Sequence, residues 1–352
     1  MKNLIEAQRS GKLAEVRAAI KADPDAARHA RVIGEAGRLA FQKTMELLHR
    51  NGSDLNAVFR GYRPLLSLMQ EDAHVAAGKP SAARLACFDW MLAHGADPEL
   101  PGAWPPSRAI IIAAFVGEPE YVKRLRKTGA KINGFAGAAL GDRRLVAKAL
   151  QRQPGFARAR DTGGLTALQC AAGSRMKGGA QLEIARLLID AGADVRARTK
   201  SWSKEVDAVY FAASSRNKAI FGLLLDRGAD ATEALVPAVW NAQEDFAELA
   251  LAHGADPDRA VASGQPLLNN LIRWGQLRQA LWLLACKASP NISDKRGWTA
   301  VHQAASRGNQ RMMHAVIDAG GDLKRRDKDG NTARDIAEVM GRGRLAAAMP
   351  AK

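Results

Sequence analysis

The sequence predicts an all-α protein, a solenoid of about ten helix-turn-helix units joined by hairpin loops. Two similar strings begin 33 residues apart, at Asp294 and Asp327, and an earlier copy begins at Asp161. A closing Gly-Ala-Asp motif recurs at residues 95–97, 192–194, 228–230 and 254–256. A period of this length indicates stacked supersecondary units, because one unit cannot bury its apolar face without its neighbours.

Each unit carries the local signals that start and stop helices. Thr166 and Thr299 stand where an N-cap side chain is needed for unpaired backbone N–H groups. The Ala-Ala pairs at 171–172 and 304–305 are small enough for paired helices to approach closely. We expect left-handed C′ residues at the glycines that follow the second helices, namely Gly192, Gly228, Gly254 and Gly320.

The strings at 161–172 and 294–305 resemble the ankyrin repeat, with its D-x-x-G-x-T-P-L-H-x-A-A pattern and closing G-A-D. The resemblance covers nearly the whole chain and is closest from residue 161 to 338. It implies a single ankyrin-repeat solenoid over 1–352. The parts expected are an N-terminal capping unit at 1–30, divergent repeats at 31–160, repeats closer to consensus at 161–326 and a C-terminal cap at 327–352. It also implies that His302, at the motif histidine, bonds the backbone of the neighbouring hairpin.

Several units depart from this pattern. Insertions are expected around 73–81 and 174–181, and the units around 134–155 and 231–254 are short and lack a full hairpin. The C-terminal unit is expected to replace its apolar second helix by Gly341-Arg-Gly-Arg344, which is typical of a cap.

Composition limits the partners and the compartment. The formal net charge is +16, which predicts affinity for something acidic. The three cysteines, at 87, 170 and 286, form no disulfide or CxxC pattern, and the start of the chain lacks a signal-peptide apolar region. We therefore expect a reducing, cytoplasmic compartment, and no membrane span because no window approaches 18 apolar residues.

No catalytic constellation is visible. The seven histidines show no HExxH or metal-ligand spacing, and no glycine-rich string matches a phosphate-binding loop. A lone motif histidine or cysteine needs a partner group to act as a catalyst. We expect no enzyme activity, no metal, no cofactor and no small-molecule substrate.

Tryptophan and arginine gather at one predicted face. In ankyrin proteins the partner usually meets the concave face, which is built from hairpin tips and the exposed ends of first helices. Trp and Arg are also the residue types most enriched in binding hot spots. Counting within the repeats places on this face Trp202, Trp240, Arg273, Trp274, Lys295, Arg296, Trp298 and Arg307. Alternatively, these rings fill gaps between hairpin and helix, as we expect for Trp90 and Trp282 on second helices.

A second candidate surface is the basic segment 121–160, which has eleven Lys or Arg residues and one acid. Its second-helix cations are candidate anion-binding residues: Lys123, Arg124, Arg126, Lys127, Arg143, Arg144, Lys148 and Arg152. They are either a solvated convex face or a patch for nucleic acid. The sequence thus predicts a protein–protein interaction module (a scaffold, adaptor or inhibitor) with an acidic partner, and, as the alternative, non-sequence-specific nucleic-acid binding.

Overall fold

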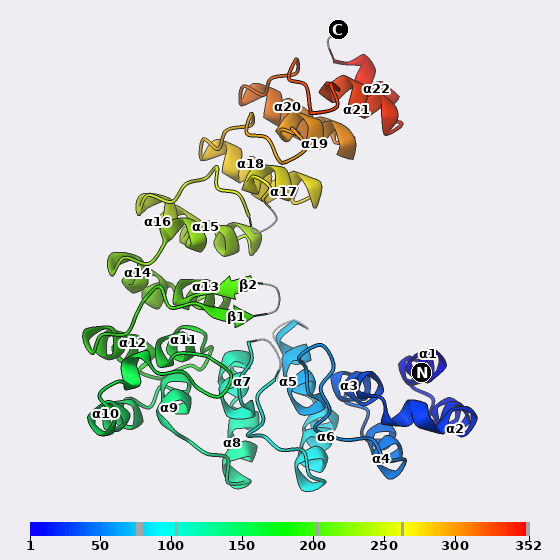
Figure 1. The fold of residues 1–352 in the computed structure, drawn as a ribbon, viewed down its shortest axis with the longest axis vertical. Coiled ribbons are helices and arrows are strands. Elements are labelled where there is room, and N and C mark those ends of the chain that lie inside the picture. Colours follow the sequence, from blue (N-terminus) through cyan, green and yellow to red (C-terminus); the bar gives the residue numbers. More distant parts are fainter. Residues whose placement is uncertain (75–79, 103–104, 202–203, 262–263, 350–352) are drawn as a thin grey trace. The chain divides into compact units, whose positions relative to one another are not determined.

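The computed structural model describes residues 1–352 except 75–79, 103–104, 202–203, 262–263 and 350–352. Within the described residues, 22 α-helices alternate as first and second helices of successive hairpins (Figure 1). The predicted all-α solenoid of helix-turn-helix units is confirmed, with eleven helix pairs where about ten were expected.

The first helices of the pairs are α1 (Lys2–Arg9), α3 (Ala30–Leu39), α5 (Pro64–His74), α7 (Ala109–Val116), α9 (Gly134–Leu140), α11 (Ala167–Ala172), α13 (Ala208–Ser215), α15 (Ala231–Trp240), α17 (Leu267–Arg273), α19 (Ala300–Arg307) and α21 (Ala333–Val339). The second helices are α2 (Leu13–Ala22), α4 (Gln42–Arg50), α6 (Ala82–Ala93), α8 (Pro119–Lys127), α10 (Arg143–Arg152), α12 (Gln181–Asp190), α14 (Lys218–Asp226), α16 (Glu244–Ala252), α18 (Leu277–Ala285), α20 (Gln310–Asp318) and α22 (Gly343–Ala347). Two short 3-10 helices, η1 (Pro24–Arg28) and η2 (Phe156–Arg158), follow α2 and α10.

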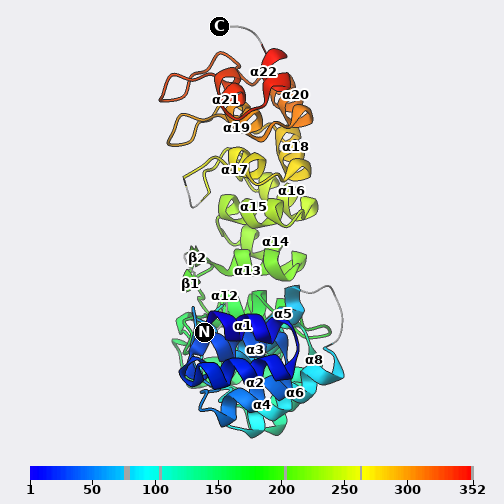
Figure 2. The same ribbon diagram turned by 90° about the vertical axis from the view of Figure 1, so that its right-hand side faces the viewer.

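The chain divides into two compact units, an N-terminal unit of residues 1–224 and a C-terminal unit of residues 225–352. In the N-terminal unit the first helices α1 to α13 pack against one another in chain order. In the C-terminal unit α17, α19 and α21 pack in order, and α18 packs on α20. Figure 2 shows the loops of the C-terminal unit projecting on one side, next to its first helices.

Helix starts and stops follow the sequence signals. The Thr166 hydroxyl accepts the Gln169 N–H, and the Gln169 Oε1 accepts the Thr166 N–H, so both ends of a capping box are satisfied. All four predicted closing glycines have positive φ, from 83° at Gly254 to 89° at Gly320. These backbone values are the left-handed ones expected after a helix end.

The core lies between the rows of first and second helices and consists largely of small and aliphatic side chains. Every residue of α7 from Ala109 to Ala114 is buried, and so are the alanines of α11 and α19. Larger rings fill the space between neighbouring pairs, as where Phe88 of α6 meets Tyr121 of α8 at 4.8 Å between centroids. Among the described helices, none combines the length and apolar composition needed to cross a bilayer.

An enlarged hairpin, predicted around Trp202, is present between α12 and α13. Strands β1 (Thr199–Ser201) and β2 (Lys204–Val206) pair antiparallel, with Thr199 opposite Val206 and Ser201 opposite Lys204. Trp202 itself lies outside the described residues.

The two short units are as predicted. Only residues 227–230 separate α14 from α15, and the Asp230 carboxylate caps α15 by accepting the Thr232 and Glu233 N–H groups. Residues 128–133 separate α8 from α9, which the Asn133 side chain caps in the same way. Neither link leaves room for a hairpin loop.

The insertion after α11 covers the ends of the preceding first helices. Arg175 N–H donates to Ala114 O at 2.9 Å, and Ala180 N–H donates to Gly141 O at 3.3 Å. A Cβ on Gly117 or Gly141 would lie within 2.8 Å of this segment, so both first helices end in glycine where the insertion crosses them. The other predicted insertion, around 73–81, lies partly outside the described residues.

One expectation about the C-terminal unit was wrong. The last unit does not lose its second helix, because α22 follows α21 and buries Leu345 and Ala346 against it. Gly341 precedes this helix and Gly343 is its first residue, so neither glycine lies in the helix interior.

Candidate functional site

The predicted Trp-Arg surface can be placed for seven of its eight residues, all of them in the C-terminal unit, since Trp202 lies outside the described residues. Trp240 is the last residue of α15, Arg273 the last of α17 and Arg307 the last of α19. Trp274 follows Arg273 as the C-cap of α17. The repeat count therefore put these four residues in equivalent places, at the ends of successive first helices.

Trp274 is the most exposed aromatic side chain of the described chain, with 64% of its surface accessible. Arg273 and Arg307 are exposed as well, and neither forms an ion pair within the part of the chain that the structure describes. A Cβ built on Gly275, the residue after Trp274, would lie 3.2 Å from Arg307 Nη2. The Arg307 guanidinium therefore lies beside the end of α17, next to Trp274.

The same arrangement repeats one pair later with a residue that the sequence analysis did not select. The Arg342 side chain crosses Gly308, where a Cβ would lie 2.7 Å from its Cδ. Arg342 is exposed and, in the described ranges, has no carboxylate partner. The glycines after α17 and α19 were the available signal in the sequence. Because Gly275 and Gly308 have no side chain, the arginine of the following repeat can lie across each of them.

We call the set Trp240, Arg273, Trp274, Arg307 and Arg342 the helix-end surface. Its cations are not neutralised by described carboxylates, and its central ring is open to solvent. An exposed ring and unpaired guanidinium groups at neighbouring helix ends suit an acidic partner that also offers apolar contact.

The hairpin-tip residues behave differently, because they are tied into the chain. Trp298 is half-buried, and its Nε1–H donates to Asp327 Oδ2 of the next repeat at 3.0 Å. The Arg296 guanidinium lies 4.0 Å from the centroid of the Trp298 ring and pairs with Asp294 at 2.9 Å. Burial raises the pKa of Asp294, but hydrogen bonds from Arg296 and from the Trp298 N–H outweigh it, so its pKa is lower than usual.

Lys295 is an exposed cation at this tip with no ion pair in the described residues, and it lies against the preceding hairpin. A Cβ on Gly264 would come within 3.0 Å of Lys295 Cε. Trp298, in contrast, joins this repeat to the next through Asp327, and the Arg296 side chain is paired within its own hairpin.

His302 has the structural role that the resemblance implied. It is fully buried, its Nδ1 accepts the Thr299 N–H at 3.2 Å, and its Nε2–H donates to Asn331 O at 3.2 Å. Because Nδ1 accepts, the proton is assigned to Nε2. Burial lowers the pKa of His302, which keeps the ring neutral and suited to these two bonds.

The thiols and the other titratable groups form no reactive cluster in the described residues. No group of three or more His, Cys, Asp or Glu side chains there lies close enough to bind a metal ion. All three cysteines are free, and burial raises the pKa of the Cys87 thiol to about 12. A thiol held protonated in this way is a poor nucleophile.

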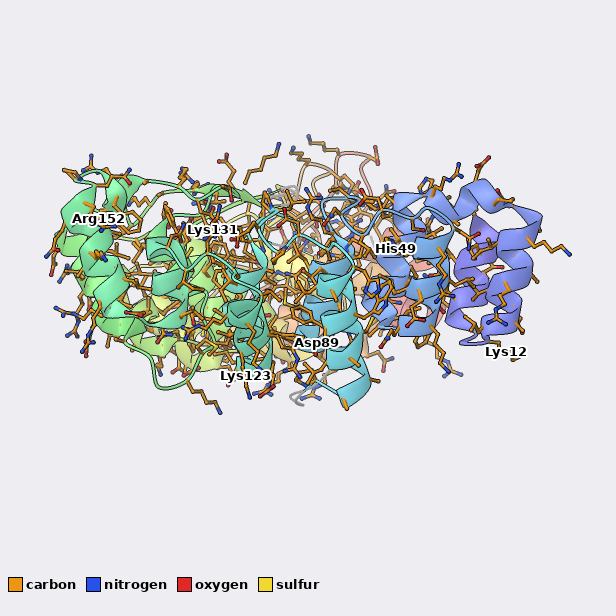
Figure 3. All side chains as sticks on the ribbon, turned by 90° about the horizontal axis from the view of Figure 1, so that it is seen from below. Lys12, His49, Asp89, Lys123, Lys131 and Arg152 are labelled. Carbon is orange, nitrogen blue, oxygen red and sulfur yellow. The ribbon has the colours of Figure 1, made fainter. Side chains whose placement is uncertain are left out.

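The cations of the basic strip differ in their partners. Lys123, Arg126 and Lys127 are exposed on α8, but the Arg124 guanidinium hydrogen-bonds both Asp89 of α6, at 3.1 Å, and Glu120 of its own helix. On α10 the four selected cations (Arg143, Arg144, Lys148 and Arg152) are exposed and have no ion pair within the described residues. Figure 3 shows Lys123 of α8 and Arg152 of α10 well apart.

Comparison with known proteins supports the repeat family on two segments. The ankyrin-repeat family model matches residues 163–200, and the model for many copies of the repeat matches residues 283–337. The chain is an ankyrin-repeat protein. Both matches fall within the segment 161–338, where the repeat pattern is closest to consensus.

Its curated relatives share only part of their length with this ankyrin-repeat protein. An ankyrin repeat-containing protein of Schizosaccharomyces pombe is 38% identical over 52 residues, 15% of this chain and 25% of the relative. A putative ankyrin repeat-containing protein of Treponema pallidum is 32% identical over 116 residues, 32% of this chain and 39% of the relative. Diacylglycerol kinase zeta of Rattus norvegicus is 33% identical over 110 residues, 30% of this chain and 12% of the kinase. A match to so small a part of the kinase does not show that this chain has catalytic activity. Ankyrin repeats generally mediate protein–protein interaction, and proteins built from them are typically non-enzymatic scaffolds.

Proposed function

We propose that this ankyrin-repeat protein is a protein-binding module, acting as a scaffold, adaptor or inhibitor in the cytoplasm. An acidic segment of the partner binds the helix-end surface of the C-terminal unit, with Lys295 at the edge of the contact. The carboxylates of that segment bind Arg273, Arg307 and Arg342, and an apolar side chain of the partner covers the Trp274 ring.

The observation that carries the proposal is the exposed Trp274 ring at the end of α17, where the Arg307 guanidinium also lies and has no ion pair among the described residues. Covering a large exposed ring removes apolar surface from water, which favours binding. Arginine binds carboxylates through two parallel N–H···O bonds, which suits recognition of Asp or Glu.

The test begins with affinity capture by the full chain from nuclease-treated extract of the source cell, followed by calorimetry on the purified partner. Trp274→Ala should weaken binding by about 2 kcal/mol, as truncation of a hot spot does. Its melting temperature should stay that of the parent, because most of the ring contacts only solvent. Trp298→Ala is a poorer probe, since it also removes the bond to Asp327.

A matched pair of arginines gives the control. Arg307→Ala should weaken binding, whereas Arg278→Ala should not, because Arg278 lies on the second helix α18 and pairs with Glu244 at 2.8 Å. Equal affinity of the parent, Trp274→Ala and Arg307→Ala would refute the proposed surface.

The alternative, binding of nucleic acid without sequence preference, draws support from α10. Arg143, Arg144, Lys148 and Arg152 line one short helix with no described acidic partner. Such binding would depend steeply on salt because phosphates dominate it.

A further inference from the structure

A cavity of about 350 Å³ opens on the N-terminal unit, between the first helices α1, α3 and α5 and the turn at 59–62. Arginines contribute much of its wall, with Arg9 on α1, Arg31 and Arg38 on α3 and Arg60 in the turn. Glu35 is the one carboxylate among its lining residues. Like the helix-end surface, this cavity is formed by first helices and a loop, but it lies in the N-terminal unit.

Two of the arginines are held in place by that carboxylate. Glu35 accepts from Arg9 Nε at 2.8 Å and from Arg38 Nε at 3.0 Å. The hydrogen bonds from Arg38 and then Arg9 outweigh burial and lower the pKa of Glu35, which therefore stays ionised. One carboxylate thus fixes two guanidinium groups and leaves the wall with an excess of positive charge.

The other two arginines stand over an aromatic ring. The Arg31 and Arg60 guanidinium carbons lie 5.8 Å and 5.4 Å from the centroid of Phe59. Neither arginine forms an ion pair in the described part of the chain. Phe59 and Tyr62 are half-buried and give the cavity an aromatic wall.

The turn that presents Arg60 is built at a cost. Phe59 and Tyr62 exchange two backbone hydrogen bonds of 3.0 Å, and the two residues between them have φ of 51° at Arg60 and 83° at Gly61. A two-residue turn with positive φ at both positions favours Asn-Gly, because Asn adopts the left-handed region more readily than arginine. The turn itself therefore does not favour an arginine at this position, and the Arg60 guanidinium is directed over Phe59 at the cavity wall.

We propose that this cavity binds a small organic phosphate with a flat ring, of mononucleotide size. The volume lies in the range of about 300–1,000 Å³ that is usual for small-molecule sites. Guanidinium groups bind phosphate in a bidentate manner, and the planes of arginine and aromatic side chains stack on flat rings. The phosphate would lie between Arg31 and Arg60, and the ring against Phe59 and Tyr62.

Calorimetry on the full chain tests the proposal with AMP, ribose 5-phosphate, adenosine and inorganic phosphate as probes. AMP should bind at least tenfold more tightly than each of the other three, because only AMP carries both the phosphate and the ring. The proposal fails if AMP does not bind at millimolar concentration, or if it binds no better than inorganic phosphate, which would indicate charge alone.

Arg60→Asn is the decisive variant. Asn suits the left-handed backbone at position 60, so the melting temperature should hold or rise while the affinity for AMP falls at least tenfold. Arg143→Gln removes one unpaired cation from α10 of the same unit and should leave AMP binding unchanged. Equal loss in both variants would overturn the site.

Arg31→Gln gives an independent reading, because this exposed residue lies near the start of α3 and its replacement leaves the sequence of the turn unchanged. A glutamate-rich peptide provides the remaining comparison. If this peptide binds tightly, loses affinity in Arg31→Gln and Arg60→Asn, and AMP does not bind, the cavity receives an acidic protein segment and the small-molecule proposal is wrong.

Discussion

The His302 imidazole joins two repeats in one protonation state. Its Nδ1 accepts from Thr299 and its Nε2–H donates to Asn331 O of the next hairpin, so a proton added to Nδ1 would break the first bond. Burial lowers the pKa of this ring below its usual value of 6.5. The unfolded chain therefore binds the proton more readily than the folded chain does.

We expect this residue to make stability depend on pH on the acid side of neutrality. The stabilisation is fully present above about pH 6.5 and is lost as the pH falls toward the folded pKa, by up to about 1.4 kcal/mol per pH unit. Asp294 and Asp327, whose pKa values are lowered from 3.8, contribute their own loss only at lower pH. Urea unfolding at pH 7.5, 6.5 and 5.5 measures the effect.

The chain offers its own matched replacement for His302. Gln169 occupies the corresponding place in an earlier repeat, accepting from Thr166 and donating to Ala197 O at 2.9 Å without titrating. His302→Gln should fold and should remove the His302 part of the pH dependence. His253 has the opposite effect, because hydrogen bonds to Leu249 O and Asp226 raise its pKa. Both proteins contain His253, so comparison of the variant with the parent cancels its effect. An unchanged slope in the variant would contradict the assignment.

Single residues also show where sequence reasoning stops. The repeat register placed Trp274 and Trp298 on one face, but it could not separate an open ring from one that donates to Asp327. That difference depends on the rotamer of a side chain and on the next repeat. Arg342 was missed for a related reason, since its side chain lies across Gly308 only when two repeats are stacked.

At the scale of elements, the pair α21–α22 packs on α19 of the preceding repeat. Thr332 and Asp335 form a capping box on α21. In the preceding loop, Asp327 accepts a hydrogen bond from Trp298, and the Asn331 carbonyl accepts one from His302. Ala333, Ile336 and Ala337 of α21 are buried, while Val339 at its end is 80% exposed. The pair thus covers α19 on one side and meets water on the other.

Removal of residues 327–352 should expose the α19 face and leave Trp298 and His302 without their partners. We expect a lower melting temperature and a marked loss of solubility, measured by circular dichroism and by sedimentation after expression. Val339→Gln serves as the control, because its side chain is already exposed and should change neither quantity. A truncated chain as stable and soluble as the parent would show that α21–α22 is not a cap.

The elements themselves were largely predictable, and the irregular ones were predictable in part. Glycine and threonine at fixed offsets marked the helix ends, and the enlarged hairpin at 199–206 was indicated by its length. The turn at 59–62 gave no such signal, because Arg-Gly is an unusual pair for its backbone and the surrounding repeat is divergent. The cavity beside this turn could therefore be found only from the three-dimensional structure.

For the whole molecule, a net charge of +16 does not say where an anion binds. The structure divides the cations into several groups with different partners. Arg124 is neutralised by Asp89 and Glu120, whereas the cations of α10 and the helix-end surface are not paired with described carboxylates. Charge reversal can therefore be aimed at one group at a time.

Lys123→Glu with Lys127→Glu, and separately Arg143→Glu with Arg144→Glu, should leave binding of the protein partner within about twofold, apart from a slower on-rate from weaker long-range attraction. Arg124 stays unchanged in both variants, because its replacement would break two ion pairs and confuse stability with binding. Association and dissociation rates at 50 and 200 mM salt provide the measurement.

If nucleic acid is the true ligand, the results invert. Binding of a DNA duplex would then be lost in the α10 variant, would fall steeply between the two salt concentrations and would be insensitive to Trp274→Ala, since phosphate contacts dominate such affinity and an exposed ring distant from α10 in sequence contributes little to it.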